Sequence, residues 1–117
     1  MKRLLALVVL TPLAVACGRD APQEGDLPEA DCNQTIPRFG EVAAFNIDCR
    51  NCHDSALDGS SRRGAPVGID YDIYSSAVMW AEETASTVYV GSMPVETELR
   101  NRDKTPLYLW SLCGTPQ

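Results

Sequence analysis

The sequence predicts an all-α domain of three to four short helices, preceded by an export segment. Apolar residues recur at three- and four-residue spacing in three separate stretches, which is typical of helices with one buried face. Each stretch is bounded by residues that commonly begin or end helices, and no α/β pattern of strands is visible. The folded part, residues 32–117, has about 85 residues, so a hydrophobic core alone would be marginal. One domain without internal repeats is expected.

The first helix is expected to begin near Thr35, with Thr35 as its cap and Pro37 in its first turn. Apolar side chains then follow at helical spacing, which predicts one buried face that leads toward residues 49–53. That face consists of Phe39, Val42, Phe45 and Cys49.

A second helix is expected to run from Asp72, as its cap, to about Tyr89. Met79 lies among serine and glutamate neighbours on the polar side of this helix. The opposite, apolar face consists of Ile73, Tyr74, Ala77, Val78, Ala81, Ala85 and Val88. Residues 91–94 then break the helix. Met93 is expected on extended backbone, because the residue before a proline is restricted to extended conformations.

The last helix is expected over residues 103–113, with Asp103 as its cap. Pro106 would take the third position, which is allowed because the first N–H groups of a helix have no helical partner. Gly114 is placed to end the helix in the left-handed conformation. The apolar surface of this helix consists of Leu107, Leu109, Trp110 and Leu112.

Residues 1–16 are expected to be an export signal. A basic start, Lys2 and Arg3, is followed by an apolar run that is too short to span a bilayer as a helix. The ending of this segment resembles a bacterial lipobox, which implies that Cys17 is lipidated and becomes the first mature residue. The large aliphatic residue stands four rather than three positions before Cys17, so cleavage by an ordinary signal peptidase stays open as an alternative.

Residues 17–31 are polar and show no helical or strand period, which predicts a disordered tether after the lipidated cysteine. Loss of Lys2 and Arg3 with the signal leaves 8 basic residues against all 16 acidic ones, so the formal net charge falls from −6 to −8. An acidic surface argues against nucleic acid and against electrostatic adhesion to anionic lipid. It suits docking onto a basic patch of a protein partner.

The motif Cys49-x-x-Cys52-His53 is the stretch of the sequence that indicates a chemical function most strongly. Two cysteines at this spacing, followed at once by a histidine, are what covalent haem attachment needs. Each thiol can add to a vinyl group of the porphyrin, and the imidazole can then bind the iron as the proximal axial ligand. His53 is the only histidine of the chain. A covalently held porphyrin would also supply the large apolar centre that so small a domain lacks.

Two other interpretations of the cysteine pair fit the sequence less well. A thiol–disulfide redox couple normally accompanies a thioredoxin-like α/β pattern, which this sequence lacks. A structural zinc site needs a second pair of ligands, and the sequence has no second C-x-x-C and no H-x-H. Haem attachment is therefore the favoured interpretation.

The Cys49–His53 motif resembles the haem-binding motif of c-type cytochromes. The Met93-Pro94 pair is similar to the distal-ligand loop of class I cytochromes c, in which a methionine sulfur is presented to the iron. A departure is Val95, where related small cytochromes often carry a second proline. The resemblance spans roughly residues 32–114 and implies a cytochrome c-like fold around one haem, with His53 as proximal and Met93 as distal ligand.

The resemblance also assigns a role to Pro66, in the loop after His53. Pro66 stands thirteen residues past His53, and in cytochromes c a proline carbonyl at a similar distance commonly accepts the other N–H of the proximal histidine. Arg62 and Arg63 could pair with haem propionates, although adjacent arginines in a loop are more often solvated.

The two remaining cysteines, Cys32 and Cys113, are expected to form a disulfide, because leftover pairs in exported proteins usually do. Cys32 precedes the first predicted helix and Cys113 ends the last one. These are the two helices that cytochromes c pack against each other.

Together these features predict a periplasm-facing monohaem cytochrome, lipid-anchored in a bacterial envelope membrane, that carries single electrons between redox protein partners. Two axial ligands, His53 and Met93, leave no open iron position for a substrate, so the chain is expected to be an electron carrier and not an enzyme. Membership of a larger redox enzyme complex stays open. The alternatives are a haem-based sensor or structural haem module and, less favoured, a thiol–disulfide oxidoreductase that uses Cys49 and Cys52.

Overall fold

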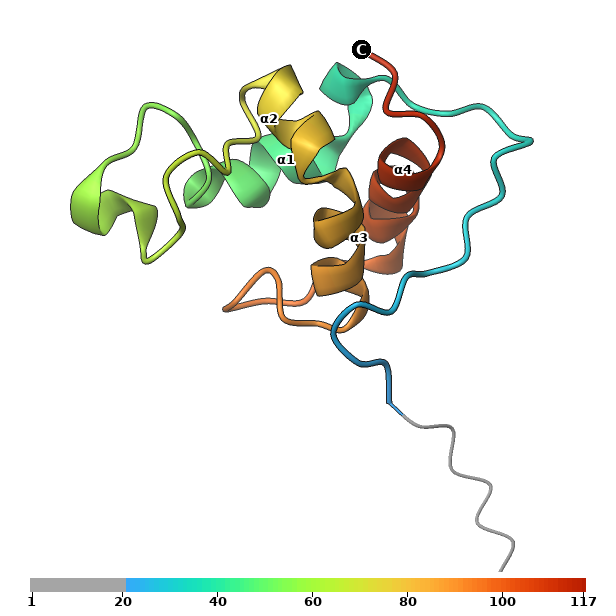
Figure 1. Ribbon diagram of the computed structural model, residues 1–117, viewed down its shortest axis with the longest axis horizontal. Coiled ribbons are helices and arrows are strands. Elements are labelled where there is room, and N and C mark those ends of the chain that lie inside the picture. The colour runs from blue at the N-terminus through green and yellow to red at the C-terminus, as the bar shows by residue number, and fades with distance from the viewer. Residues whose placement is uncertain (1–20) are drawn as a thin grey trace, which may run out of the picture.

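The computed structural model of the chain describes residues 21–117, and all regular secondary structure in that part is helical (Figure 1). No strand occurs in this range, which confirms the all-α class. The helices are α1 (Ala43–Ile47), α2 (Tyr74–Met79), α3 (Ala81–Tyr89) and α4 (Asn101–Leu112), with 3₁₀ turns η1 (Phe39–Glu41), η2 (Cys49–Asn51) and η3 (Gly59–Arg62).

The core lies where α1 and α3 pack against α4. Trp110 is fully buried at its centre, with the Phe45 ring edge-on at 5.0 Å and the Phe39 ring at 5.6 Å between centroids. The Pro116 carbonyl accepts hydrogen bonds from Trp110 Nε1 (2.8 Å) and from the N–H of Phe39 (2.9 Å). The C-terminal end of the chain is thereby tied to the first helical turn.

The first helix differs from its prediction in where it begins. Thr35 and Pro37 precede any helical residue, and the expected single helix is three short pieces, η1, α1 and η2. Extended backbone at Val42, with φ −79° and ψ 91°, separates the first two pieces. The predicted face is still correct, since Val42 and Phe45 are buried and Phe39 packs against the core.

The second predicted helix is two helices, because the backbone of Trp80 (φ −103°, ψ 13°) interrupts it. Thr84 Oγ1 donates to the Trp80 carbonyl at 2.6 Å, a back-bond of the kind that bends helices. The break turns α2 relative to α3, so Val78 is exposed, while Ala85 and Val88 on α3 are buried as predicted.

The cap prediction for this region is also wrong. α2 begins at Tyr74, and Asp72 accepts hydrogen bonds from the N–H (2.8 Å) and the hydroxyl of Ser55 instead. Partial burial opposes ionisation of Asp72, but the hydrogen bonds from Ser55 outweigh it and lower the pKa of the carboxyl. Ile73 therefore lies outside the helix and is exposed.

Helix α4 begins at Asn101, two residues before the predicted cap. Asp103 is its third residue and accepts a hydrogen bond from Arg100 Nε at 2.8 Å. Pro106 consequently sits inside the helix, where it removes the N–H that would bond to the Arg102 carbonyl. The predicted end is confirmed, because the helix stops at Leu112 and Gly114 takes a left-handed φ of 97°.

The predicted disulfide is confirmed. Cys32 and Cys113 are bonded, with their α-carbons 5.3 Å apart and a sequence separation of 81 residues. The bond joins the end of α4 to the extended segment of residues 21–38, which runs outside the helices (Figure 1). Within that segment the N–H of Gly25 donates to the buried Ser86 hydroxyl on α3 at 3.0 Å.

The expected export signal, residues 1–16, and the expected lipidation site, Cys17, lie outside the described residues. Among the helices of residues 21–117, none has both the length and the apolar character needed to cross a bilayer.

Candidate functional site

A cavity of about 350 Å³ lies between the C-x-x-C-H turn, the loop that follows it, helix α3 and the loop of residues 91–97, here called the Met93 loop. All five residues that the sequence assigns to the haem site line this one cavity: Cys49, Cys52, His53, Pro66 and Met93. The other methionine of residues 21–117, Met79, is not among the lining residues and is 77% exposed on α2. The structure therefore brings together segments that are some 40 residues apart in the chain.

The 3₁₀ turn η2 arranges the wall that carries the two thiols. The Cys49 carbonyl accepts from the N–H of Cys52 at 3.2 Å and from the N–H of His53 at 2.9 Å. In a 3₁₀ turn, residues three apart lie on the same face, so Cys49 and Cys52 are both presented to the cavity. Both are free, half-buried thiols.

His53 is fixed by three further contacts. The N–H of Tyr71 donates to its carbonyl at 2.8 Å, and the Tyr71 ring lies edge-on to the imidazole at 5.5 Å. Its Nδ1 lies 3.0 Å from the carbonyl oxygen of Ile69. Because a carbonyl can only accept, Nδ1 must carry the proton, and a neutral ring then keeps its Nε2 lone pair free to bind a metal.

The partner of His53 corrects the prediction for Pro66. The carbonyl at Nδ1 belongs to Ile69, sixteen residues past His53, whereas the Pro66 carbonyl accepts from Arg62 Nη2 at 2.7 Å. The reason is local. The bond from the Tyr71 N–H to the His53 carbonyl draws residues 69–71 alongside the histidine, while Arg62 binds the Pro66 carbonyl.

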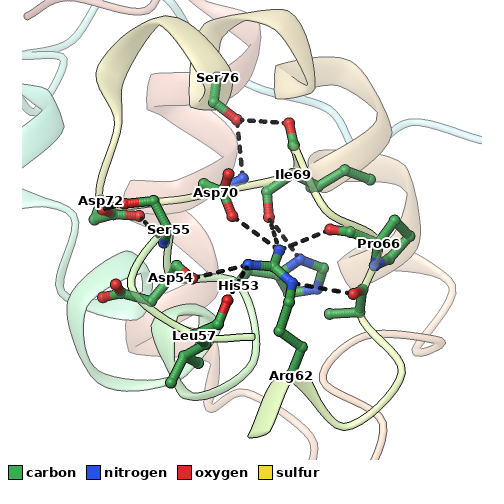
Figure 2. Close-up of polar contacts among 12 residues, drawn as sticks. His53, Asp54, Ser55, Leu57, Arg62, Pro66, Ile69, Asp70, Asp72 and Ser76 are labelled. Carbon is green, nitrogen blue, oxygen red and sulfur yellow. Dashed lines mark hydrogen bonds and ion pairs between the residues drawn. The ribbon is translucent and has the colours of Figure 1, made fainter. Parts of the chain in front are cut away.

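Arg62 is buried beside the site, in a position that the sequence did not indicate. It is only 3% exposed, and its guanidinium is surrounded by acceptors of the loop that follows His53 (Figure 2). The acceptors are the carbonyls of Asp54 (2.8 Å), Leu57 (3.5 Å), Ala65 (3.2 Å), Pro66 (2.7 Å) and Ile69 (3.2 Å), and Oδ1 of Asp70 (2.8 Å).

The expectation that Arg62 is solvated or binds a haem propionate is therefore wrong. Its exposed neighbour Arg63 lies at the cavity wall and pairs with Glu96 at 3.4 Å. Nothing in the local sequence distinguishes the two arginines, because the acceptors of Arg62 are mostly main-chain carbonyls.

The Met93 loop forms another wall of the cavity, and in the sequence it lies some 40 residues after the C-x-x-C-H turn. The Thr87 carbonyl near the end of α3 accepts from the N–H of Ser92 (2.9 Å) and from the N–H of Met93 (3.1 Å). Gly91 makes the turn between them with φ 80°, which favours glycine. Met93 is 37% exposed, so it lies at the mouth of the cavity rather than in the core.

Tyr71 and Thr84 are two further wall residues that the sequence did not single out. Thr84 Oγ1 donates its proton to the Trp80 carbonyl, so the Tyr71 hydroxyl must be the donor in its 2.6 Å bond to Thr84. Burial of Tyr71 raises the pKa of its hydroxyl to about 12. The side chain is therefore a neutral, rigid part of the wall next to His53.

The thiol of Cys49 is hard to ionise. Burial raises its pKa from 9.0 to about 12, and the negative charge of Asp48 adds to the effect. This is the reverse of the environment of a reactive cysteine, in which positive charge or a helix N-terminus lowers the pKa.

The chain without haem is accordingly expected to lose stability in alkali. The unfolded thiol ionises above about pH 9 and the folded one only near pH 12, so stability is lost as the pH rises between these values. At pH 10 the share of Cys49 alone is about 1.4 kcal/mol of unfolding free energy. Urea unfolding of the full-length chain at pH 7.5 and pH 10 measures it. Cys49→Ala should remove this share and Cys52→Ala should keep it; equal losses in both variants would contradict the assignment.

In residues 21–117 no three histidine, cysteine or acidic side chains are grouped so that they could hold a metal ion by themselves. Comparisons of the chain with protein-family models, with curated proteins and with solved structures found no match.

Proposed function

We propose that this chain is a monohaem c-type cytochrome, similar to class I, that carries single electrons between redox partners. One observation carries the proposal. Two thiols in a C-x-x-C-H turn, the only histidine of the chain and a methionine loop all border the same cavity, and the Nδ1 atom of that histidine is already engaged by a carbonyl.

The donor set fits a covalently held haem. Cys49 and Cys52 would form the two thioether bonds, His53 would bind the iron through Nε2, and Met93 would supply a second, sulfur ligand. A haem held in this way supplies a one-electron iron couple whose potential depends on its axial ligands and surroundings.

The residues around the cavity suit that role. The Ile69 carbonyl orients His53 and makes its imidazole a stronger electron-pair donor to a metal, as such hydrogen bonds do for metal-binding histidines. Tyr71 and Val88 give the wall an apolar, rigid surface. Met93 lies at the mouth, which leaves one edge of the site near solvent for exchange of electrons with a partner.

Two observations favour this proposal over a thiol–disulfide oxidoreductase. The raised pKa of Cys49 keeps that thiol protonated, whereas the attacking species in thiol exchange is a thiolate. In addition, residues 21–117 contain no strand and thus no thioredoxin-like sheet.

The location of the protein is part of the proposal. The apolar N-terminal run and Cys17 support export and lipid anchoring in a bacterial envelope membrane, with the domain facing the periplasm. The excess of acidic residues supports docking on a basic patch of a redox protein partner.

The test is a visible spectrum and a redox titration of the chain produced by export in a host that attaches haem. Sharp α and β bands in the reduced state and a one-electron titration are expected, and a thiol enzyme would give neither. Ready binding of carbon monoxide to the reduced protein would favour a sensor, because a firmly bound Met93 should block it. Absence of the bands would contradict the proposal.

A further inference from the structure

Arg62 and Asp70 form a buried ion pair at 2.8 Å, with side chains 3% and 10% exposed. Such a pair is a poor source of stability, because removing two charges from water costs about as much as their attraction returns. Its presence beside the proposed haem site therefore calls for another explanation.

The hydrogen bonds of Arg62 reach along the whole loop that follows His53. Nη1 donates to the Asp54 carbonyl, at the start of the loop, while Nη2 donates to the Pro66 and Ile69 carbonyls near its end. A planar guanidinium with five donors can join these points at once, which a lysine cannot do. Arg62 thus fixes the shape of a loop that has only the four-residue turn η3 as regular structure.

One of these acceptors is shared with the histidine. The Ile69 carbonyl oxygen lies 3.2 Å from Arg62 Nη2 and 3.0 Å from His53 Nδ1 (Figure 2). On the other side of the segment 68–70, the Ser76 hydroxyl donates to the Gly68 carbonyl (3.1 Å) and accepts from the Asp70 N–H (2.9 Å). The segment is held from both sides, with Arg62 on the side of His53.

We infer that Arg62 is a positioning residue for the proximal histidine. By binding Asp70 and the loop carbonyls, it holds the Ile69 oxygen at His53 Nδ1 and so keeps the proton on Nδ1 and Nε2 free. The inference rests on the proposed function only in so far as Nε2 is taken to bind iron. The placement of the proton can be measured without haem.

The test uses R62Q/D70N, which removes both charges together and leaves polar side chains of similar size. R100Q/D103N is the matched control, because it neutralises an arginine–aspartate pair of the same 2.8 Å length that lies away from the cavity. The first readout is ¹⁵N NMR of the full-length chain at about pH 8, where histidine is ordinarily neutral. His53 is the only histidine, so the signal needs no assignment.

The ratio of the Nδ1–H to the Nε2–H form is expected to fall about fivefold or more in R62Q/D70N, the effect of losing one hydrogen bond, and to stay unchanged in R100Q/D103N. The second readout is the reduction potential of the haem-loaded chain. With a less electron-rich imidazole, the ratio of reduced to oxidised protein at a fixed potential should rise about tenfold, or about 59 mV.

R62K covers the case in which the double variant does not fold. Lysine keeps the charge opposite Asp70 but cannot reach the carbonyls together, so it should change both readouts in the same direction. Wild-type values of both in a folded R62Q/D70N or R62K would overturn the inference, and so would a fall in potential with the Nδ1–H form retained. If the wild-type chain attaches no haem, the proposed function fails, and the NMR ratio alone still decides the role of Arg62.

Discussion

Replacing Cys32 and Cys113 together with serine is expected to lower the free energy of unfolding by about 4–5 kcal/mol, the loop-closure entropy of an 81-residue separation. A loss of this size is a large part of the total stability of a domain this small. The disulfide ties the extended segment 21–38 to the end of α4, so its loss should free that segment from the helical core. Urea unfolding of the oxidised wild type and of the double variant measures the difference.

Reducing agent provides the control for this prediction. Dithiothreitol should lower the stability of the wild type toward that of the double variant and leave the double variant unchanged. A wild type that is as stable reduced as oxidised would show that the bond contributes nothing.

Replacing Met93 with alanine in the haem-loaded chain is expected to abolish the near-infrared charge-transfer band from sulfur to iron and to leave the haem attached. Met93 lines the cavity that contains His53, and its backbone is held to the end of α3 by the Thr87 carbonyl. No other described methionine borders that cavity. Absorption spectra of the oxidised protein between the visible and near infrared measure the loss.

Met79→Ala is the matched control, because it removes the same side chain from an exposed site on α2. The band should survive in that variant. Its survival in Met93→Ala and loss in Met79→Ala would reverse the ligand assignment.

The sequence predicted well those features that depend on single residues or on short spacings between residues. Three local signals were informative: the C-x-x-C-H turn, the methionine beside Pro94, and the two remaining cysteines, Cys32 and Cys113. In the structure, the turn and Met93 line one cavity, and the two cysteines form a disulfide. The helical class followed from periodicity, because spacing alone decides which face of a helix is buried.

Helix ends and interruptions were predicted less well, for reasons that lie in tertiary contacts. The Asp72 carboxylate could cap a helix, but the Ser55 N–H and hydroxyl bind it instead. The break at Trp80 could not be predicted from the sequence, because no proline or glycine lies at that position. The back-bond from Thr84 that accompanies it has no signature in the sequence.

The surroundings of His53 could not be predicted from residue types. The atom that faces Nδ1 is a main-chain carbonyl, which every residue carries, so residue types alone could not distinguish the Ile69 carbonyl from that of Pro66. The same is true of Arg62, whose acceptors are mostly carbonyls, and only the fold separates it from the solvated Arg63.

The most direct measurement for the proposed function is the intact mass of the exported chain, produced in cells that attach haem. Covalent attachment through Cys49 and Cys52 predicts a mass raised by one haem that survives denaturation, and the rise should vanish in the variant with alanine at both positions. A wild-type mass without this addition, and with both thiols free to react with iodoacetamide, would contradict the proposal that the cavity is a haem site.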